Sequence, residues 1–179
     1  MRKKASKRKR RVISKADIHG RRVGTKRSDM RWEDPDGTIW ASKWEYGVWL
    51  GISKELGSRA ERCSHAFNYA SPVRQATCLH CGSSECVTFR TYTPDFYVHN
   101  KASADSERGG YYIEAKGYLR PQRRRLLRDF RKARQSIDLR LLFEKDYPAT
   151  SSMSIVEWAR RYLKCPVSVW NGKLPEDWR

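Results

Sequence analysis

The chain has no stretch of about 18 consecutive apolar residues, so its sequence predicts no membrane-spanning helix. It also lacks the pattern of a secretory signal peptide, because the basic N-terminus continues into further polar residues instead of an apolar segment. No internal repeat is visible, so a repeat architecture is not expected. At 179 residues, 39% of them hydrophobic, the chain is long enough for one domain with a core of its own.

Acidic residues are scarce. The 20 Asp and Glu residues face 38 Lys and Arg residues, which leaves a net charge of +18, and residues 1–31 alone carry +12 of it. Such a surplus points to a polyanionic partner, and nucleic acid is the usual one. We expect residues 1–31 to form a disordered basic arm that contacts DNA phosphates, and residues 32–179 to form the folded domain. A nuclear-import signal is an alternative interpretation of the arm.

The segment from Tyr92 to Gly117 carries the strongest chemical pattern. Two β-rich runs, Phe96–Val98 and 111–113, flank a polar turn, as in a hairpin. Side chains two apart in a strand share a face, so Glu114 and Lys116 point the same way. Pairing of the runs brings Asp95 to the same edge. The sequence therefore predicts two carboxylates and one ammonium group in a small volume.

This cluster fits metal-dependent phosphodiester hydrolysis. Mg²⁺ is a hard cation that takes one or two protein carboxylates together with phosphate oxygens and water. A neighbouring lysine can orient or deprotonate the attacking water, or stabilise charge that develops on the phosphate. The alternative is a surface hairpin in which Asp95 and the Glu114–Lys116 pair are incidental, because short patterns of charged residues recur by chance.

The cysteines are clustered, and four of the five fall between residues 63 and 86. Cys78-Leu-His-Cys81-Gly is typical of a zinc knuckle, in which two thiolates on one turn bind the same ion. Cys63, Cys78, Cys81 and Cys86 would complete a tetrahedral structural Zn²⁺ site, with His65 or His80 as possible substitutes. We expect a zinc-binding insert at 63–89. The alternative is a loop of reduced cysteines.

A second basic feature follows the hairpin at 117–135. Its pattern predicts an amphipathic helix with Pro121 in the first turn, an apolar stripe and a cationic outer face. So many cations would repel one another without a polyanion, so we expect the helix to bind DNA. The cationic residues are Arg120, Arg123, Arg124, Arg125, Arg128, Arg131, Lys132 and Arg134.

Three more elements are predicted from hydrophobic periodicity. A helix is expected over 39–56, with Trp40, Trp44, Val48, Ile52 and Leu56 on its buried face and Ser42 or Thr38 as its cap. A short strand is expected over 65–70, and a buried one over 138–144. A last helix is expected over 154–163, with Ile155, Trp158, Ala159 and Tyr162 facing inward and Cys165 in the core beyond it.

The hairpin motif resembles a known one. Pro94-Asp95 and Glu114-Ala115-Lys116 are similar to the motif of the PD-(D/E)xK nuclease superfamily, and 92–96 and 114–117 resemble the active-site strands of phage endonuclease I, a Holliday-junction resolvase family. Ser-Lys-Trp-Glu at 42–45 resembles the start of that family's first helix. The resemblance covers about residue 40 to the C-terminus, and leaves out the arm and the cysteine insert.

The resemblance implies an α/β fold with a restriction-endonuclease-like core, a mixed central sheet flanked by helices. It implies Mg²⁺ (or Mn²⁺) held by Asp95, Glu114 and the Ala115 carbonyl, a site completed by Glu45, and Lys116 acting on water or phosphate. It further implies cleavage of branched DNA such as Holliday junctions by a homodimer, in the cytoplasm of a bacterial or phage-infected cell. The insert lies near where the family joins its subunits.

Two other functions fit the same residues. One is a different nuclease of the superfamily, such as a transposase-type nicking subunit or an enzyme that cuts ordinary duplex. The other is a non-catalytic, zinc-containing nucleic-acid-binding protein that uses the arm and the arginine-rich helix. The second would tolerate loss of Asp95, whereas a nuclease would not.

Overall fold

The computed structural model describes residues 21–23, 31–72, 87–100 and 109–179. These residues fall into two compact units, and the boundary between the units along the chain lies after Tyr46. The first unit contains a three-stranded antiparallel sheet in the order β1 (Arg21–Val23), β2 (Arg31–Glu33) and β3 (Ile39–Trp40). Residues 21–23 thus form a strand, although the sequence predicted no structure before residue 31.

Asp34 organises the turn between β2 and β3. Its Oδ1 accepts hydrogen bonds from the amides of Asp36 (3.0 Å) and Thr38 (2.9 Å), and its Oδ2 accepts one from the Trp40 indole (2.8 Å). An aspartate whose side chain accepts hydrogen bonds from backbone amides of its own turn is typical of turn sequences. Trp40 pairs with Trp32 in the sheet, so the prediction that it lies on the buried face of a helix is wrong.

The helix itself, α1 (Lys43–Leu56), begins three residues later, with the amide of Glu45 donating to the Ser42 hydroxyl (3.1 Å). Ser42 is therefore the cap, as one of the two predicted candidates. Within the second unit α1 buries Val48, Ile52 and Leu56, as its periodicity predicted. The 3₁₀ turn η1 (Gly57–Arg59) then leads into strand β4 (Ala60–Arg62).

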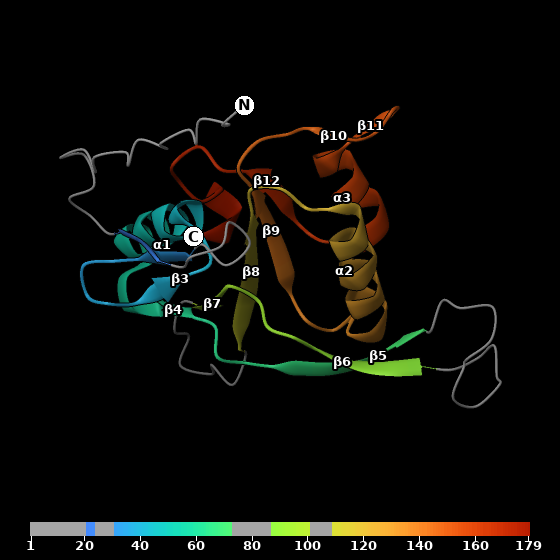
Figure 1. Ribbon diagram of the computed structural model, residues 1–179, viewed down its shortest axis with the longest axis horizontal. Helices are drawn as coiled ribbons and strands as arrows, with labels where there is room; N and C mark the ends of the chain where they lie inside the picture. Colours follow the sequence, from blue (N-terminus) through green and yellow to red (C-terminus); the bar gives the residue numbers. More distant parts are fainter. Residues whose placement is uncertain (1–20, 24–30, 73–86, 101–108) are drawn as a thin grey trace, which may run out of the picture. The chain divides into compact units, whose positions relative to one another are not determined.

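A mixed five-stranded sheet is the centre of the second unit (Figure 1). Its order is β12 (Val167–Val169), β9 (Leu139–Phe143), β8 (Gly110–Lys116), β7 (Phe96–His99) and β4. Strands β12, β9 and β8 run parallel, whereas β7 is antiparallel to both of its neighbours. The protein is therefore α/β with a mixed sheet flanked by helices, as predicted.

Helices α2 (Pro121–Ala133) and α3 (Ile155–Leu163) pack side by side against one face of this sheet (Figure 1). Helix α3 begins with a capping box in which Ser154 and Glu157 bond each other's backbone amides. The core on this face joins α2, α3 and β9, through Leu127, Phe130, Leu139, Leu141, Phe143, Ile155, Trp158, Ala159, Leu163 and Cys165. Tyr162 is 43% exposed, so its predicted place on the inner face is wrong, and Leu163 takes it.

The other face of the sheet is covered by α1, whose Trp49 stacks on Phe96 with ring centroids 5.8 Å apart. Two small elements complete the unit: the hairpin β10 (Pro148–Thr150) with β11 (Met153–Ser154), and the 3₁₀ turn η2 (Glu176–Trp178). No helix among the described residues is long and apolar enough to cross a membrane.

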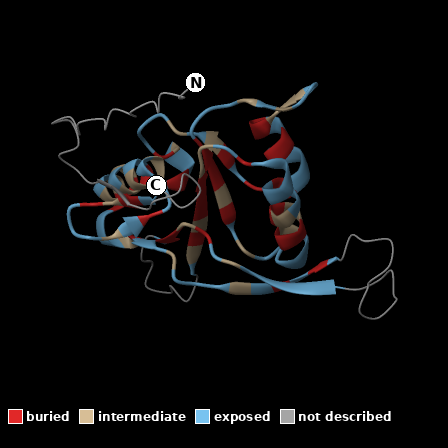
Figure 2. Cartoon of the chain, in the orientation of Figure 1, coloured by how far each residue is buried: buried red, intermediate tan, exposed pale blue. Residues whose placement is uncertain are grey.

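A two-stranded antiparallel ribbon lies outside the sheet and crosses α2. It consists of β5 (Phe67–Pro72) and β6 (Val87–Tyr92), so the strand predicted at 65–70 is displaced by two residues. Strand β5 is anchored to α2 by Ser71, whose hydroxyl donates to Asp129 (3.0 Å). Strand β6 is exposed over most of its length (Figure 2), and Phe89 is 80% exposed.

Candidate active site

The predicted hairpin is formed by β7 and β8, and its register creates the candidate site. Phe96 pairs with Ile113, so the residue before β7 and the residue after Ile113 meet at one edge. There the Asp95 carboxylate accepts a hydrogen bond from the backbone amide of Ala115 at 2.7 Å through Oδ2. The first residue of β8 is Gly110, where the Cβ of any other residue would lie 1.9 Å from the Val98 carbonyl oxygen. The hairpin therefore requires glycine here.

Lys116 joins the two carboxylates. Its ammonium group lies 2.7 Å from Oε1 of Glu114 and 3.1 Å from Oδ2 of Asp95. The side chain of Glu114 is only 6% exposed, against 15% for Asp95 and 31% for Lys116. The cluster is thus open to solvent at the lysine and closed at the glutamate. This confirms that the three charged groups lie together, as the sequence predicted.

Burial shapes the charge state of Glu114. Burial, and then the negative charge of Asp95, raise its pKa to about 7, and the nearby Lys116 opposes the shift. Burial lowers the pKa of Lys116, but the charges of Glu114 and Asp95 outweigh it and raise the pKa above its usual value. Lys116 is therefore an ammonium group at neutral pH, while Glu114 takes up or releases a proton near neutrality.

Glu114 has one oxygen that is only partly satisfied. Its Oε2 is buried and makes no hydrogen bond of ordinary geometry, so the Tyr92 hydroxyl, which acts as a donor to this carboxyl, satisfies it only in part. Such an atom is costly unless a proton, a water molecule or a cation satisfies it. The carboxylates of Asp95 and Glu114 offer the hard oxygen ligands that Mg²⁺ prefers, so the residues present fit a divalent cation. No group of three or more His, Cys, Asp and Glu side chains that could hold a metal occurs among the described residues.

Tyr92 is a neighbour that the sequence analysis did not single out. The centroid of its ring lies 4.1 Å from that of Phe130 in α2. Its buried hydroxyl makes no hydrogen bond of ordinary geometry, but it acts as a donor to the Glu114 carboxyl. Burial, and then the charge of Glu114, raise the pKa of this hydroxyl well above its usual value. Tyr92 thus forms the inner wall of the site as a neutral phenol. Its position two residues before Pro94-Asp95 is the only sequence signal for this role.

Glu45 lies in the first unit, in the first turn of α1, and is partly exposed. The three charged groups of the hairpin all lie in the second unit. The expectation that Glu45 completes a metal site with them remains a prediction. The same holds for the Ala115 carbonyl, because the structure assigns a contact only to the Ala115 amide.

The cations on and next to α2 divide into three groups. Arg120, Arg123, Arg125 and Lys132 are exposed and form a solvent-facing cationic surface, as predicted from the sequence. Arg134 is also exposed, but its guanidinium donates to the Asn68 carbonyl. Helix α2 begins five residues after Lys116, so chain length keeps its first turn within about 18 Å of the site. Glu114 pairs with Leu141 of the core, so it points to the sheet face that α2 and α3 cover.

The structure corrects the prediction that Arg124 contacts DNA. It is buried, its Nε donates to the Leu119 carbonyl (2.9 Å) and its Nη1 donates to the Ala149 carbonyl (2.6 Å). The guanidinium also lies over the Trp158 ring at 5.8 Å. Arg124 therefore holds the segment before α2 and the β10 strand together, and is not available to DNA.

Arg128 and Arg131 are intermediate cases. Arg131 Nη1 donates to the Ile137 carbonyl (2.6 Å), which ties this side chain to the chain itself. Arg128 is partly buried, and its Nε has no partner among the described residues. The contact of the exposed cations with DNA stays a prediction, since the structure shows only that these side chains face solvent.

Most of the predicted zinc site lies outside the described residues, because Cys78, His80, Cys81 and Cys86 all fall in 73–86. Cys63 is described. It lies beside the carboxylate site, where its amide donates to the Asp95 carbonyl (3.1 Å). Cys165 is buried in the core, as predicted, and burial raises the pKa of its thiol to about 12.

The prediction that Cys63 shares one Zn²⁺ with Cys78, Cys81 and Cys86 therefore stays a prediction, because three of these four residues lie outside the described part of the chain.

Comparison of the chain with protein-family models, curated proteins and solved structures gave no match.

Proposed function

We propose that this protein is a metal-dependent endodeoxyribonuclease that hydrolyses phosphodiesters in branched DNA, such as Holliday junctions. The observation that carries the proposal is the cluster at the end of the β7–β8 hairpin, where one ammonium group bridges the carboxylates of Asp95 and Glu114 and a buried oxygen of Glu114 is left without a hydrogen bond of ordinary geometry. The resemblance to the PD-(D/E)xK superfamily and to endonuclease I rests on the same residues.

The roles of these residues follow from their surroundings. Asp95 and Glu114 would hold Mg²⁺ or Mn²⁺, with Glu45 and the Ala115 carbonyl as further candidate ligands. When bound, the cation supplies Lewis acidity at the scissile phosphate. Lys116 is held as an ammonium group by both carboxylates, which favours stabilisation of charge on the phosphate and orientation of the attacking water over removal of its proton. Tyr92 keeps water away from the inner side of Glu114.

DNA is the substrate that the charges favour. The net charge of +18 and the exposed cations of α2 suit a phosphate backbone. Branched substrates and a homodimer that makes two cuts come from the resemblance, since a two-fold junction suits a two-fold dimer. A structural Zn²⁺ in the insert remains part of the proposal, held by Cys63, Cys78, Cys81 and Cys86, with His65 or His80 as a substitute for one of them.

The test is a cleavage assay on a four-way junction and on linear duplex of the same sequence, with Mg²⁺ and with EDTA. We expect junction cleavage that requires Mg²⁺ and that is lost in Asp95→Ala and Lys116→Ala, while both variants still bind DNA. Cleavage of duplex at the same rate would instead support a general duplex nuclease. If the parent protein binds DNA strongly but does not cleave it with any divalent metal tested, the result would support the alternative function, a non-catalytic DNA-binding protein.

A further inference from the structure

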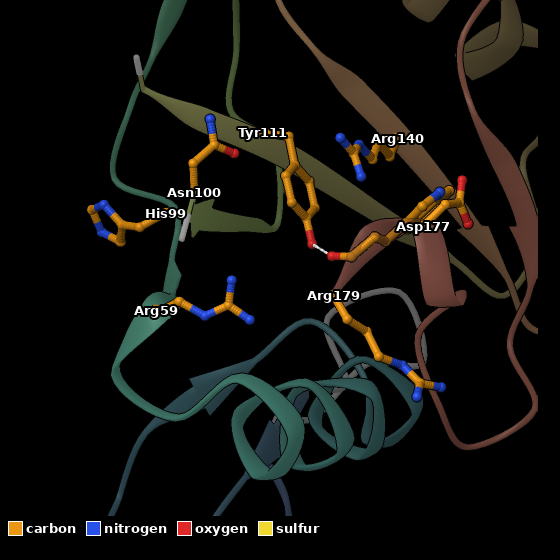
Figure 3. A pocket seen from close by; sticks show the side chains of 8 residues that line it. Arg59, His99, Asn100, Tyr111, Arg140, Asp177 and Arg179 are labelled. Atoms are coloured by element: carbon orange, nitrogen blue, oxygen red, sulfur yellow. Dashed lines mark hydrogen bonds between the residues drawn. The ribbon is translucent and has the colours of Figure 1, made fainter. Parts of the chain in front are cut away.

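A cavity of about 260 Å³ lies at the other end of the β7–β8 hairpin from the carboxylate cluster (Figure 3). Its walls come from four parts of the second unit. Arg59 ends η1, Asn100 follows β7, Tyr111 lies at the start of β8, and Arg140 lies in β9. A fifth part, η2 and the residue after it, closes the cavity, and the carbonyl oxygen of Trp178 in η2 accepts a hydrogen bond from the Tyr111 hydroxyl.

This cavity is separate from the carboxylate site. Tyr111 and Glu114 are three residues apart in one strand, so their side chains point to opposite faces of the sheet. Three residue steps also place them about 10 Å apart along the strand. Arg140 pairs with Ile113, which confirms that it lies on the Tyr111 face. A group bound in the cavity is therefore not the phosphate that reacts at Asp95 and Glu114.

The lining is rich in guanidinium groups. Arg59, Arg140 and Arg179 line the cavity, and Asp177 is the one acidic residue among the lining residues. Arg140 is held in place by two hydrogen bonds to Asp138, of 2.8 and 3.2 Å, and by its position 3.6 Å from the Tyr111 ring centroid. Each guanidinium carries five N–H donors, so these contacts leave donors for a ligand.

Arg59 differs from the other two. Arg179 is tied to Glu55 at 3.1 Å and to the Leu174 carbonyl at 2.8 Å. Arg59 has no hydrogen bond or ion pair among the described residues, although it is partly buried. In Figure 3 it points toward Tyr111 from the side opposite Arg140. A guanidinium group without a partner among the described residues, in a cavity that two further arginines line, favours an anion there.

We propose that this cavity binds a phosphate group of a nucleic-acid strand, away from the phosphate that is cut. Planar guanidinium groups that approach from different sides suit an anion with several oxygens, and arginine is the residue that proteins use for bidentate phosphate contacts. The cavity volume accommodates a phosphate together with part of the sugars on either side of it. The choice of DNA as the source of the phosphate rests on the proposed function; a free phosphate or a nucleotide would present the same chemistry.

The experiment measures DNA binding by full-length protein in EDTA, where cleavage cannot occur, over a series of salt concentrations. Arg59→Ala should weaken binding and lower the slope of log K against log salt by roughly 0.9, the value for one phosphate contact on duplex. Arg59→Lys keeps the charge and should retain most of the slope. Lys54→Ala is the matched control, because Lys54 is an exposed cation on α1 that does not line the cavity.

A slope in Arg59→Ala equal to that of the parent, or a change of equal size in Lys54→Ala, would overturn the proposal. A second experiment identifies where the bound phosphate comes from. The protein is titrated with inorganic phosphate and with thymidylyl-thymidine, and NMR follows the Asn100 amide and the Trp178 indole. We expect the dinucleotide to shift these resonances more. If only inorganic phosphate does so, and Arg59→Ala binds DNA normally, the assignment to DNA is refuted. The readout is binding alone, so the result stands apart from the test for cleavage.

Discussion

Replacing Glu114 by glutamine should change how the stability of the metal-free protein depends on pH. The pKa of Glu114 rises from 4.5 to about 7 on folding, because burial and Asp95 disfavour its charge. A carboxyl whose pKa is raised on folding binds its proton more tightly in the folded state, so the free energy of unfolding falls as pH rises from 4.5 through 7. A shift of this size corresponds to about 3 kcal/mol.

Glutamine has nearly the same shape and never ionises. Glu114→Gln and the parent should therefore have similar stability near pH 4.5, and the variant should be more stable by about 3 kcal/mol at pH 8. The measurement is urea unfolding in EDTA at pH 4.5, 6 and 8, with the difference between the two proteins taken at each pH so that other titrating groups cancel. Glu176→Gln, at an exposed carboxylate outside the site for which the described residues show no ion pair, is the control.

Addition of Mg²⁺ supplies the second half of the test. A cation that binds the ionised carboxylates stabilises the folded state by mass action, so Mg²⁺ should recover stability in the parent at pH 8. It should have little effect on Glu114→Gln, which has lost one charged ligand. If the parent and the variant lose the same stability between pH 4.5 and pH 8, the buried Glu114 carboxyl is not under electrostatic strain and this reasoning fails.

The other predictions concern the cations and the zinc. Arg124→Ala should lower the free energy of unfolding by about 3 kcal/mol, since it removes the donor from one buried carbonyl, of Leu119, and from one partly buried carbonyl, of Ala149. Arg125→Ala should change the free energy of unfolding by less than about 0.5 kcal/mol and weaken DNA binding instead; equal unfolding midpoints of the two variants would contradict the assigned roles. Deleting residues 1–20, which spares β1, should weaken binding to junction and duplex alike and flatten the salt dependence; a loss of junction preference alone would make the arm a structure-reading element. Purified protein should contain about one zinc ion per chain, lost when Cys78 or Cys81 is replaced; elemental analysis without stoichiometric metal would refute the site.

Several features were determined by the sequence over short distances. The alternation around 111–116 fixes which side chains share a face, and the β7–β8 pairing then places Asp95 beside Lys116 without help from the rest of the chain. Local chemistry likewise fixed the capping serines, Ser42 and Ser154, and the start of α2 at Pro121. Each depends on hydrogen bonds or backbone angles within a few residues, so it could be predicted from the sequence.

Burial and partner choice were decided only by the tertiary structure. Of two neighbouring arginines on α2, Arg124 is buried and Arg125 is exposed. The reason is that the Ala149 carbonyl, 25 residues away along the chain, accepts a hydrogen bond from Arg124 and not from Arg125. The spacing of Trp40 fits the apolar face of a helix, yet its indole donates to Asp34 and its backbone pairs with Trp32 in a sheet. The physical reason is that such contacts join residues far apart in sequence, and composition and periodicity carry no record of which distant groups will meet.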